Sequence, residues 1–232
     1  MYRMLSILLF AAFLNGEAVW AYEETTVSDG GTLVGTVMLE GQIPKPKGYN
    51  LVTLPDRFYC GRISDGQGWR ILQPFDVGSE GEFRDGVVYL EGIEKGKPFE
   101  DHGLSQIEAR DCQFLPFTTV VRDDQSVTVV NMDPVMHDIQ AYETSNMGAR
   151  VLFNVPLPMN PQHPRDFKDR SAAALYHKHM PGAPMKELVK LSKGRRIFAM
   201  QCGFHAYMES WGLAVMNPYF TKTDEHGRFV LR

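Results

Sequence analysis

Residues 197–216 read Ile-Phe-Ala-Met-Gln-Cys-Gly-Phe-His-Ala-Tyr-Met-Glu-Ser-Trp-Gly-Leu-Ala-Val-Met. Two apolar runs, Arg195–Gln201 and Gly212–Met216, flank a short loop, and runs of this length and composition predict β-strands. The loop places a thiol, an imidazole and a thioether close together in the chain, at Cys202, His205 and Met208. Sulfur donors suit Cu(I) and imidazole suits Cu(II), so the loop predicts a copper site.

A mononuclear site of this kind needs a second imidazole from elsewhere in the chain. Residues 131–137, Asn-Met-Asp-Pro-Val-Met-His, supply a candidate. This segment follows the predicted strand Ser126–Asn131, turns at Pro134 and places His137 at the start of the predicted strand His137–Tyr142. Taken singly, each of these residues is more often structural, but together they predict one metal centre.

The rest of the chain shows the same short apolar runs separated by turn signals, and it contains no long amphipathic helix and no repeat. Many short strands at this spacing predict an all-β sandwich or barrel. One segment, residues 160–182, is rich in proline and then in alanine, which predicts an insertion with a short helix over one end of the sandwich. The other predicted strands are Thr32–Leu39, Gly86–Glu91, Thr118–Val121, Arg150–Val155, Lys186–Leu191 and Arg228–Leu231.

Composition excludes several classes of protein. The 24 basic and 28 acidic side chains give a formal charge of −4, so there is no basic surplus to bind nucleic acid. The sequence has no Gly-x-Ser-x-Gly or His-Glu-x-x-His motif, no phosphate-binding loop and no dinucleotide fingerprint. A single metal site with every position filled leaves little room for a substrate. Electron transfer is therefore expected rather than catalysis.

The N-terminal residues 1–21 resemble a secretory signal peptide: Arg3 precedes a short apolar run, and small residues end the segment at Ala21. Cleavage after Ala21 would place the mature chain in the periplasm or outside the cell. The alternative is that the same segment is a membrane anchor. No other stretch is apolar enough to span a membrane.

The loop 202–208 resembles the Cys-x-x-His-x-x-Met copper loop of amicyanin-type cupredoxins, and Asp133–His137 resembles the segment that carries their first histidine ligand. The resemblance covers about Ser126–Asn217. It implies that His137, Cys202 and His205 are equatorial copper ligands and that Met208 is the axial ligand. It also implies a periplasmic electron-transfer protein whose partner is a redox protein such as a c-type cytochrome, or a membrane redox complex.

Residues 217–220 and 223–229 are similar to bacterial exported plastocyanin-like proteins, in which a cupredoxin module lies beside β segments of the carboxypeptidase regulatory-like type. The implied fold is a Greek-key cupredoxin β-sandwich over residues 104–217, with the insertion at 160–182. A smaller β-sandwich-like unit over residues 30–100 precedes it. A C-terminal β hairpin, residues 218–232, follows, and we expect it to pair with the N-terminal unit.

Two positions depart from the family pattern. Ala206 stands where proline usually follows the loop histidine, and Asp138 stands where asparagine commonly follows the first histidine. Both positions affect ligand orientation and redox potential.

A different class of function remains open at the level of sequence. The protein could hold or deliver copper without an electron-transfer role, or the N-terminal unit could bind a partner or a glycan. Histidines and methionines around the insertion favour this alternative, since they could form a second metal site; a polar loop that happens to contain them is the plainer interpretation. These residues are His163, His177, His179, Met180 and Met185.

Cys60 and Cys112 are the other two cysteines. If Cys202 binds metal and the chain is exported, these two form an even pair, which predicts a Cys60–Cys112 disulfide. The alternative is two reduced buried thiols.

The aromatic residues Phe204, Tyr207 and Trp211 either form an apolar docking patch around the loop or pack in the core.

Overall fold

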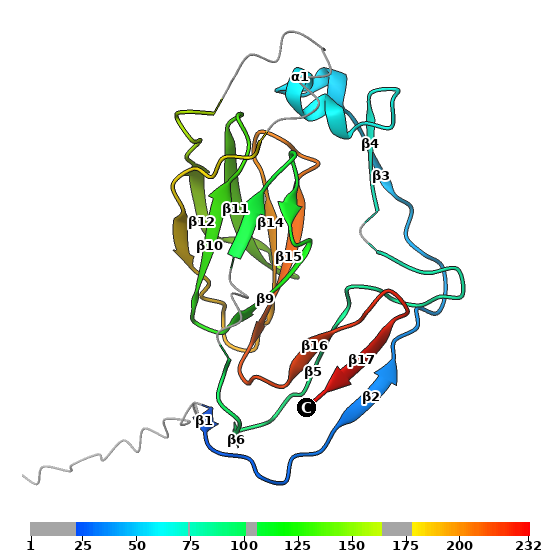
Figure 1. Cartoon of the computed structure of the whole chain (residues 1–232), viewed down its shortest axis with the longest axis vertical. Helices are drawn as coiled ribbons and strands as arrows, with labels where there is room; N and C mark the ends of the chain where they lie inside the picture. Colours follow the sequence, from blue (N-terminus) through cyan, green and yellow to red (C-terminus); the bar gives the residue numbers. More distant parts are fainter. Residues whose placement is uncertain (1–21, 74, 101–105, 164–177) are drawn as a thin grey trace, which may run out of the picture.

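A computed structural model describes residues 22–73, 75–100, 106–163 and 178–232 (Figure 1). The predicted signal peptide and the Ala-rich part of the predicted helical insertion lie outside the described residues. Within the described part of the chain, no helix is long and apolar enough to cross a membrane.

The centre of the molecule is a sandwich of two β-sheets, as predicted. The first sheet has the order β13-β10-β7-β8, with β7 and β10 parallel. The second has the order β12-β11-β14-β15-β9, with β9 and β15 parallel. The chain passes repeatedly from one sheet to the other, as it does in Greek-key sandwiches. The bounds are β7 Gln106–Ala109, β8 Phe114–Leu115, β9 Thr118–Arg122, β10 Ser126–Asn131, β11 His137–Ser145, β12 Gly148–Leu157, β13 Met185–Leu188, β14 Ile197–Gln201 and β15 Glu209–Val215.

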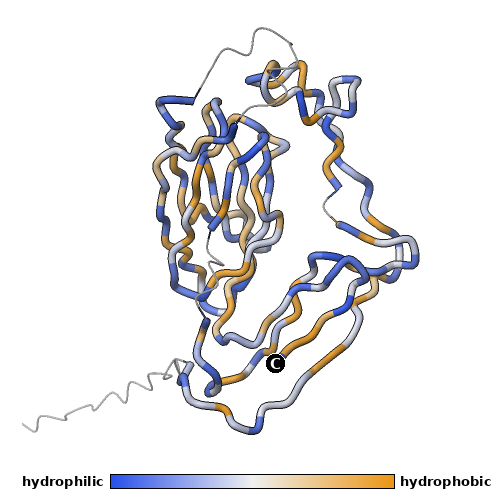
Figure 2. Tube along the Cα trace, in the orientation of Figure 1, coloured by the Kyte–Doolittle hydropathy of each residue, from blue (hydrophilic) through white to orange (hydrophobic). Residues whose placement is uncertain are grey.

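The core lies between these two sheets because alternate residues of each strand face inward. Along β11, His137, Ile139 and Ala141 are buried while the residues between them are partly exposed. Figure 2 shows hydrophobic and hydrophilic positions alternating along the strands of the sandwich. Strands β10 and β17 (Arg228–Leu231) have the predicted bounds. Strands β7 and β8 were not predicted, because both are short and the first is half polar.

The N-terminal part of the chain forms four two-stranded sheets, β1-β6, β3-β4, β2-β17 and β5-β16. The C-terminal segment supplies the second strand of two of them, so the expected pairing of this segment with the N-terminal unit is confirmed. Its two strands, β16 and β17, lie in different sheets and do not form the expected hairpin with each other, because each pairs with an N-terminal strand. The β2, β5, β16 and β17 ribbons lie at the opposite end of the sandwich from helix α1 (Figure 1). The bounds are β1 Glu23–Glu24, β2 Leu33–Thr36, β3 Lys47–Asn50, β4 Trp69–Leu72, β5 Val87–Tyr89, β6 Lys95–Gly96 and β16 Phe220–Lys222.

Residues 51–63, which we call the cover, are helical turns rather than the β structure expected for this part of the chain. They comprise η1 (Leu51–Thr53), α1 (Arg57–Cys60) and η2 (Gly61–Ile63). Leu51, Tyr59 and Cys60 are buried in the same core cluster as the sandwich strands. The cover therefore packs onto the end of the sandwich and is part of its core.

The Cys60–Cys112 disulfide is confirmed, with the two Cα atoms 5.6 Å apart. It joins α1 of the cover to the turn between β7 and β8. Asp111 and Cys112 in that turn both have a positive φ, as the two central residues of a type I′ turn require. The bridge thus fastens the cover to the sandwich.

Candidate metal centre

The structure brings His137, Cys202 and His205 together at the covered end of the sandwich. His137 is the first residue of β11, Cys202 directly follows β14, and His205 lies in the loop before β15. The loop is closed by its own backbone: the Cys202 amide donates to the Met208 carbonyl over 3.1 Å, and the Met208 amide donates to the His205 carbonyl over 2.8 Å. These bonds fix where the thiol and the imidazole of the loop point.

Three donor atoms of these residues form a triangle. The two Nδ1 atoms are 3.2 Å apart, and Cys202 Sγ lies 3.6 Å from His205 Nδ1 and 4.0 Å from His137 Nδ1. A three-coordinate ion with bonds of about 2.0 Å to nitrogen and about 2.3 Å to sulfur needs donors separated by roughly 3.5–3.7 Å. The triangle therefore has the size and the donor set for one ion of the kind that imidazole and thiolate bind.

All three donor residues are shut away from solvent, since each is at most 1% exposed. Burial raises the pKa of the Cys202 thiol to about 12, because a buried thiolate loses its hydration. The thiol of the metal-free chain is therefore protonated at neutral pH. Binding of a metal ion must displace that proton, and the cation then compensates the buried charge.

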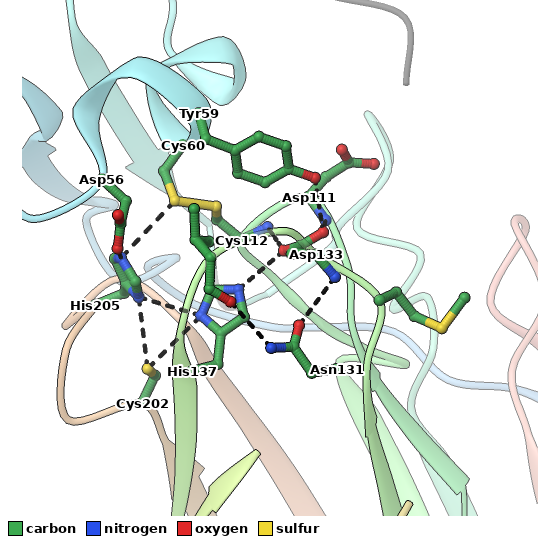
Figure 3. A network of polar contacts seen from close by, with 12 residues as sticks. Asp56, Tyr59, Cys60, Asp111, Cys112, Asn131, Asp133, His137, Cys202 and His205 are labelled. Atoms are coloured by element: carbon green, nitrogen blue, oxygen red, sulfur yellow. Dashed lines mark hydrogen bonds and ion pairs between the residues drawn. A yellow bond between two sulfur atoms is a disulfide. The ribbon is translucent and has the colours of Figure 1, made fainter. Parts of the chain in front are cut away.

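The outer nitrogen of His137 lies against a carboxylate that the sequence analysis did not single out. His137 Nε2 is 2.9 Å from Asp133 Oδ2, and neither side chain is exposed (Figure 3). Burial alone would raise the pKa of Asp133, but the hydrogen bonds from His137, Cys112 and Tyr59 hold this pKa below its usual value. Because an ionised carboxylate only accepts, the hydrogen of His137 is on Nε2, and its Nδ1 lone pair faces the triangle.

Asp133 also links three segments at the end of the sandwich on which the cover packs. Its Oδ1 accepts from the Tyr59 hydroxyl and from the Asp111 amide, and its Oδ2 accepts from the Cys112 amide, each over 2.8 Å. One carboxylate thus holds a candidate ligand, the turn that carries the disulfide and a tyrosine of the cover. Burial and the neighbouring carboxylate raise the pKa of Tyr59, so it stays a hydrogen-bond donor.

The outer nitrogen of His205 faces the cover. His205 Nε2 lies 3.3 Å from Asp56 Oδ2 and 3.8 Å from Cys60 Sγ of the disulfide. Figure 3 shows the two imidazoles and Cys202 facing one another, with Asp133 and Asp56 on their outer sides. Each imidazole is therefore backed by a carboxylate.

Asp138 is bonded to the loop backbone. The amide of Gly203 donates to Asp138 Oδ1 over 2.6 Å. A Cβ atom at position 203 would lie 2.8 Å from Asp138 Oδ2 and 2.5 Å from Gln140 Nε2, so a larger residue there would displace these two side chains. The carboxylate of Asp138 therefore positions the residue next to Cys202.

Met208 is buried in the same loop, 1% exposed. Its backbone closes the loop, as described above. The role of its sulfur as the axial ligand stays a prediction.

Of the residues that could form a second metal site, only some are described by the structure. His179 lies between two carboxylates, with Nε2 3.2 Å from Asp111 Oδ2 and Nδ1 3.8 Å from Asp133 Oδ1. His163 is buried and joins no group of three possible nitrogen, thiol or carboxylate ligands within the described residues. His177 lies outside those residues. Asp111, Asp133 and His179 each offer one donor atom within 4.8 Å of the others, so this group could hold an ion, but His179 is the one member that the sequence analysis named as a candidate ligand.

The aromatic residues near the loop are divided between surface and core. Phe204 is 44% exposed and Trp211 is 38% exposed, but Tyr207 is buried. Tyr207 packs edge-on against Tyr49 of β3, with ring centroids 6.2 Å apart. Core packing is therefore confirmed for Tyr207, whereas Phe204 and Trp211 are exposed and their docking role stays a prediction.

Asp133, Asp56 and Tyr59 were not identified as functional residues from the sequence. Asp133 had a local signal, since it lies four residues before His137 and follows the strand β10. Asp56 and Tyr59 had none, because nothing near them in the chain indicates which segment lies over the loop.

Comparison with known proteins gives structural likenesses only. No family model matches the chain, and no curated protein matches it in sequence. Among solved structures, a purple cupredoxin from Nitrosopumilus maritimus is 18% identical, with a TM-score of 0.31 over 48% of this chain and 99% of that one. A mutant of amicyanin in its reduced state is 12% identical, with a TM-score of 0.31 over 56% of this chain and 100% of that one. Auracyanin A from Chloroflexus aurantiacus is 10% identical, with a TM-score of 0.30 over 47% of this chain and 96% of that one.

Proposed function

We propose that this chain is an exported electron-transfer protein with one copper ion bound by His137, Cys202 and His205, and with Met208 as the axial ligand. The observation that carries the proposal is the buried triangle of two imidazole nitrogens and one thiol sulfur. Copper, when bound, would supply one-electron chemistry by alternating between Cu(I) and Cu(II). A His₂Cys set with a weak axial thioether is the ligand arrangement of blue-copper electron-transfer sites.

The protein's own residues keep the donor atoms in place. Asp133 orients His137, the loop hydrogen bonds hold Cys202 and His205, and the sandwich strands on both sides fix the ends of the loop. Donors that are held by the surrounding structure need to move little when the charge of the site changes. This is the property that rapid electron transfer requires.

Burial of the site favours electron transfer over copper delivery or catalysis. Delivery requires an acceptor ligand to approach the metal, and catalysis requires an open position for a substrate. The three donor residues are at most 1% exposed, and the cover lies over His205. An electron can cross such a covering, whereas a metal ion or a substrate cannot pass without opening it.

The disulfide supports an oxidising compartment, the periplasm or the outside of the cell. We propose a redox protein such as a c-type cytochrome, or a membrane redox complex, as the partner. The exposed Phe204 and Trp211, next to the loop in sequence, are the apolar residues that a partner would contact.

The mature chain, freed of metal and loaded with one equivalent of Cu(II), tests the function. We expect an intense thiolate-to-Cu(II) absorption, a copper EPR signal and reversible one-electron reduction on a millisecond timescale. We also expect slow loss of Cu(I) to excess bicinchoninic acid, a Cu(I) chelator. Fast loss of copper to the chelator together with sluggish reduction would favour the delivery protein instead.

Replacing Met208 with leucine is expected to keep the absorption band and to raise the reduction potential. The thioether is a weak donor that mainly tunes the metal, and losing it disfavours Cu(II). The expected rise is at least about 60 mV, a tenfold shift in the equilibrium for one electron. Voltammetry of the copper-loaded variants measures it, with Met185→Leu as the control. An unchanged potential in Met208→Leu would remove Met208 from the ligand set.

A further inference from the structure

Asp56 occupies an unusual position at the start of α1. It is the N-cap residue of this helix, a position where aspartate commonly accepts a hydrogen bond from the first turn, yet its side chain makes no such bond. Its backbone has φ +52°, in the left-handed region that few residues other than glycine adopt. Conformations of this kind persist when the surrounding structure demands them.

The carboxylate of Asp56 is directed at the metal centre instead of at its own helix. Its Oδ2 lies 3.3 Å from His205 Nε2, on the side of the ring opposite the donor triangle. His205 is completely buried, and among the described residues its outer nitrogen forms an ion-pair contact with Asp56. Like Asp133 beside His137, Asp56 places a carboxylate oxygen at the outer ring nitrogen, but at 3.3 Å rather than 2.9 Å and with a side chain that is 37% exposed.

The cover is fastened at three points, which fixes Asp56 over the site. Cys60 is bonded to Cys112, the Tyr59 hydroxyl donates to Asp133, and the Arg62 guanidinium forms an ion pair with Asp111 over 3.0 Å. The guanidinium also lies 3.8 Å from the centre of the Tyr59 ring. The disulfide, the hydrogen bond and the ion pair all join residues 59–62 to residues 111–133.

We propose that Asp56 is a positioning residue of the metal centre, presented to His205 by the disulfide-anchored cover. It keeps the hydrogen of His205 on Nε2 and so leaves the Nδ1 lone pair directed at the metal. The inference rests on the proposed copper function. On this proposal the N-terminal segment helps to orient a ligand of the metal centre.

Two substitutions of Asp56 distinguish the effect of its carboxylate from the effect of its backbone conformation. Asp56→Gly removes the side chain and suits the positive φ, while Asp56→Asn keeps the shape and removes the charge. Asp124→Gly is the matched control, because Asp124 is exposed and has φ +58° in the turn between β9 and β10. That turn lies at the end of β10 away from Asn131 and Asp133.

The first measurement uses the metal-free protein with the disulfide intact. Nitrogen-15 NMR of the imidazoles at pH 8 measures the fraction of His205 that carries its hydrogen on Nε2, and this fraction should be the same in the unsubstituted protein and in Asp124→Gly. In Asp56→Gly this fraction should fall, because the Nε2–H of His205 loses its carboxylate acceptor. This readout does not depend on copper.

The second measurement is the affinity for Cu(II). Loss of a group that orients a metal ligand commonly costs 10–100-fold in affinity. We expect a loss in this range for Asp56→Gly, a smaller loss for Asp56→Asn, and less than a twofold change for Asp124→Gly. An unchanged Nε2–H fraction of His205 together with an unchanged affinity in Asp56→Gly would overturn the role of Asp56 and leave the proposed function standing. A missing copper–thiolate band in the unsubstituted protein would overturn the proposed function.

Discussion

Replacing Cys202 with serine is expected to abolish the thiolate-to-Cu(II) absorption and to lower the affinity for Cu(I) by more than about 100-fold. Cys202 is the thiol in the donor triangle, and a hydroxyl is a poor ligand for Cu(I). Neither a disulfide nor a site made of imidazoles alone gives this absorption. Optical titration with Cu(II) and competition with bicinchoninic acid for Cu(I) measure the two effects.

The fold should survive the Cys202→Ser substitution, because the strands on both sides of the loop are held by the core of the sandwich. A buried hydroxyl in place of the thiol should lower the free energy of unfolding of the metal-free protein by only about 1 kcal/mol. Met200→Leu is the control, since it removes another fully buried sulfur, from β14, and should leave the band intact. A Cys202→Ser variant that kept the band would exclude Cys202 as the ligand.

Removing the disulfide with the double substitution Cys60→Ala and Cys112→Ala is expected to lower the free energy of unfolding by about 4 kcal/mol. The bridge joins residues separated by 52 positions, and the entropy that it removes from the unfolded chain grows with that separation. Alanine is chosen because both cysteines are at most 1% exposed and a serine hydroxyl there would be buried. Urea denaturation of the metal-free protein, followed by tryptophan fluorescence, measures the difference.

The same double substitution should loosen the cover and expose His205. Diethyl pyrocarbonate, which modifies accessible imidazoles, should leave His205 intact in the disulfide-bonded protein and modify it in the variant. Treating the unsubstituted protein with dithiothreitol should reproduce both effects. A loss of stability below about 1 kcal/mol, with His205 still protected, would show that the cover is held by its other contacts.

The fold class was accessible from sequence because alternation of apolar and polar residues is a local property of each strand. The long strands β10, β11 and β12 were predicted for that reason. Strands β7 and β8 were missed because a few residues cannot show alternation, and their pairing depends on partners far along the chain. The helical turns of the cover were missed because no periodic pattern spans 51–63.

The sequence by itself determined the donor types and the loop. Cys202, His205 and Met208 lie within one short segment between two strands, so their proximity follows from chain connectivity. His137 could be added because it begins a strand after a proline turn.

Only the tertiary structure decided what surrounds these donors. The contact between Cys60 and His205 joins residues 145 positions apart, and nothing in either segment encodes the other. Which segment covers the site is settled by the burial of Leu51 and Tyr59 in the shared core, by the disulfide and by the hydrogen bonds to Asp133. These are long-range contacts that form only once the sheets have packed. The tertiary structure therefore determines that Asp133 and Asp56 are the carboxylates that lie behind the two imidazoles.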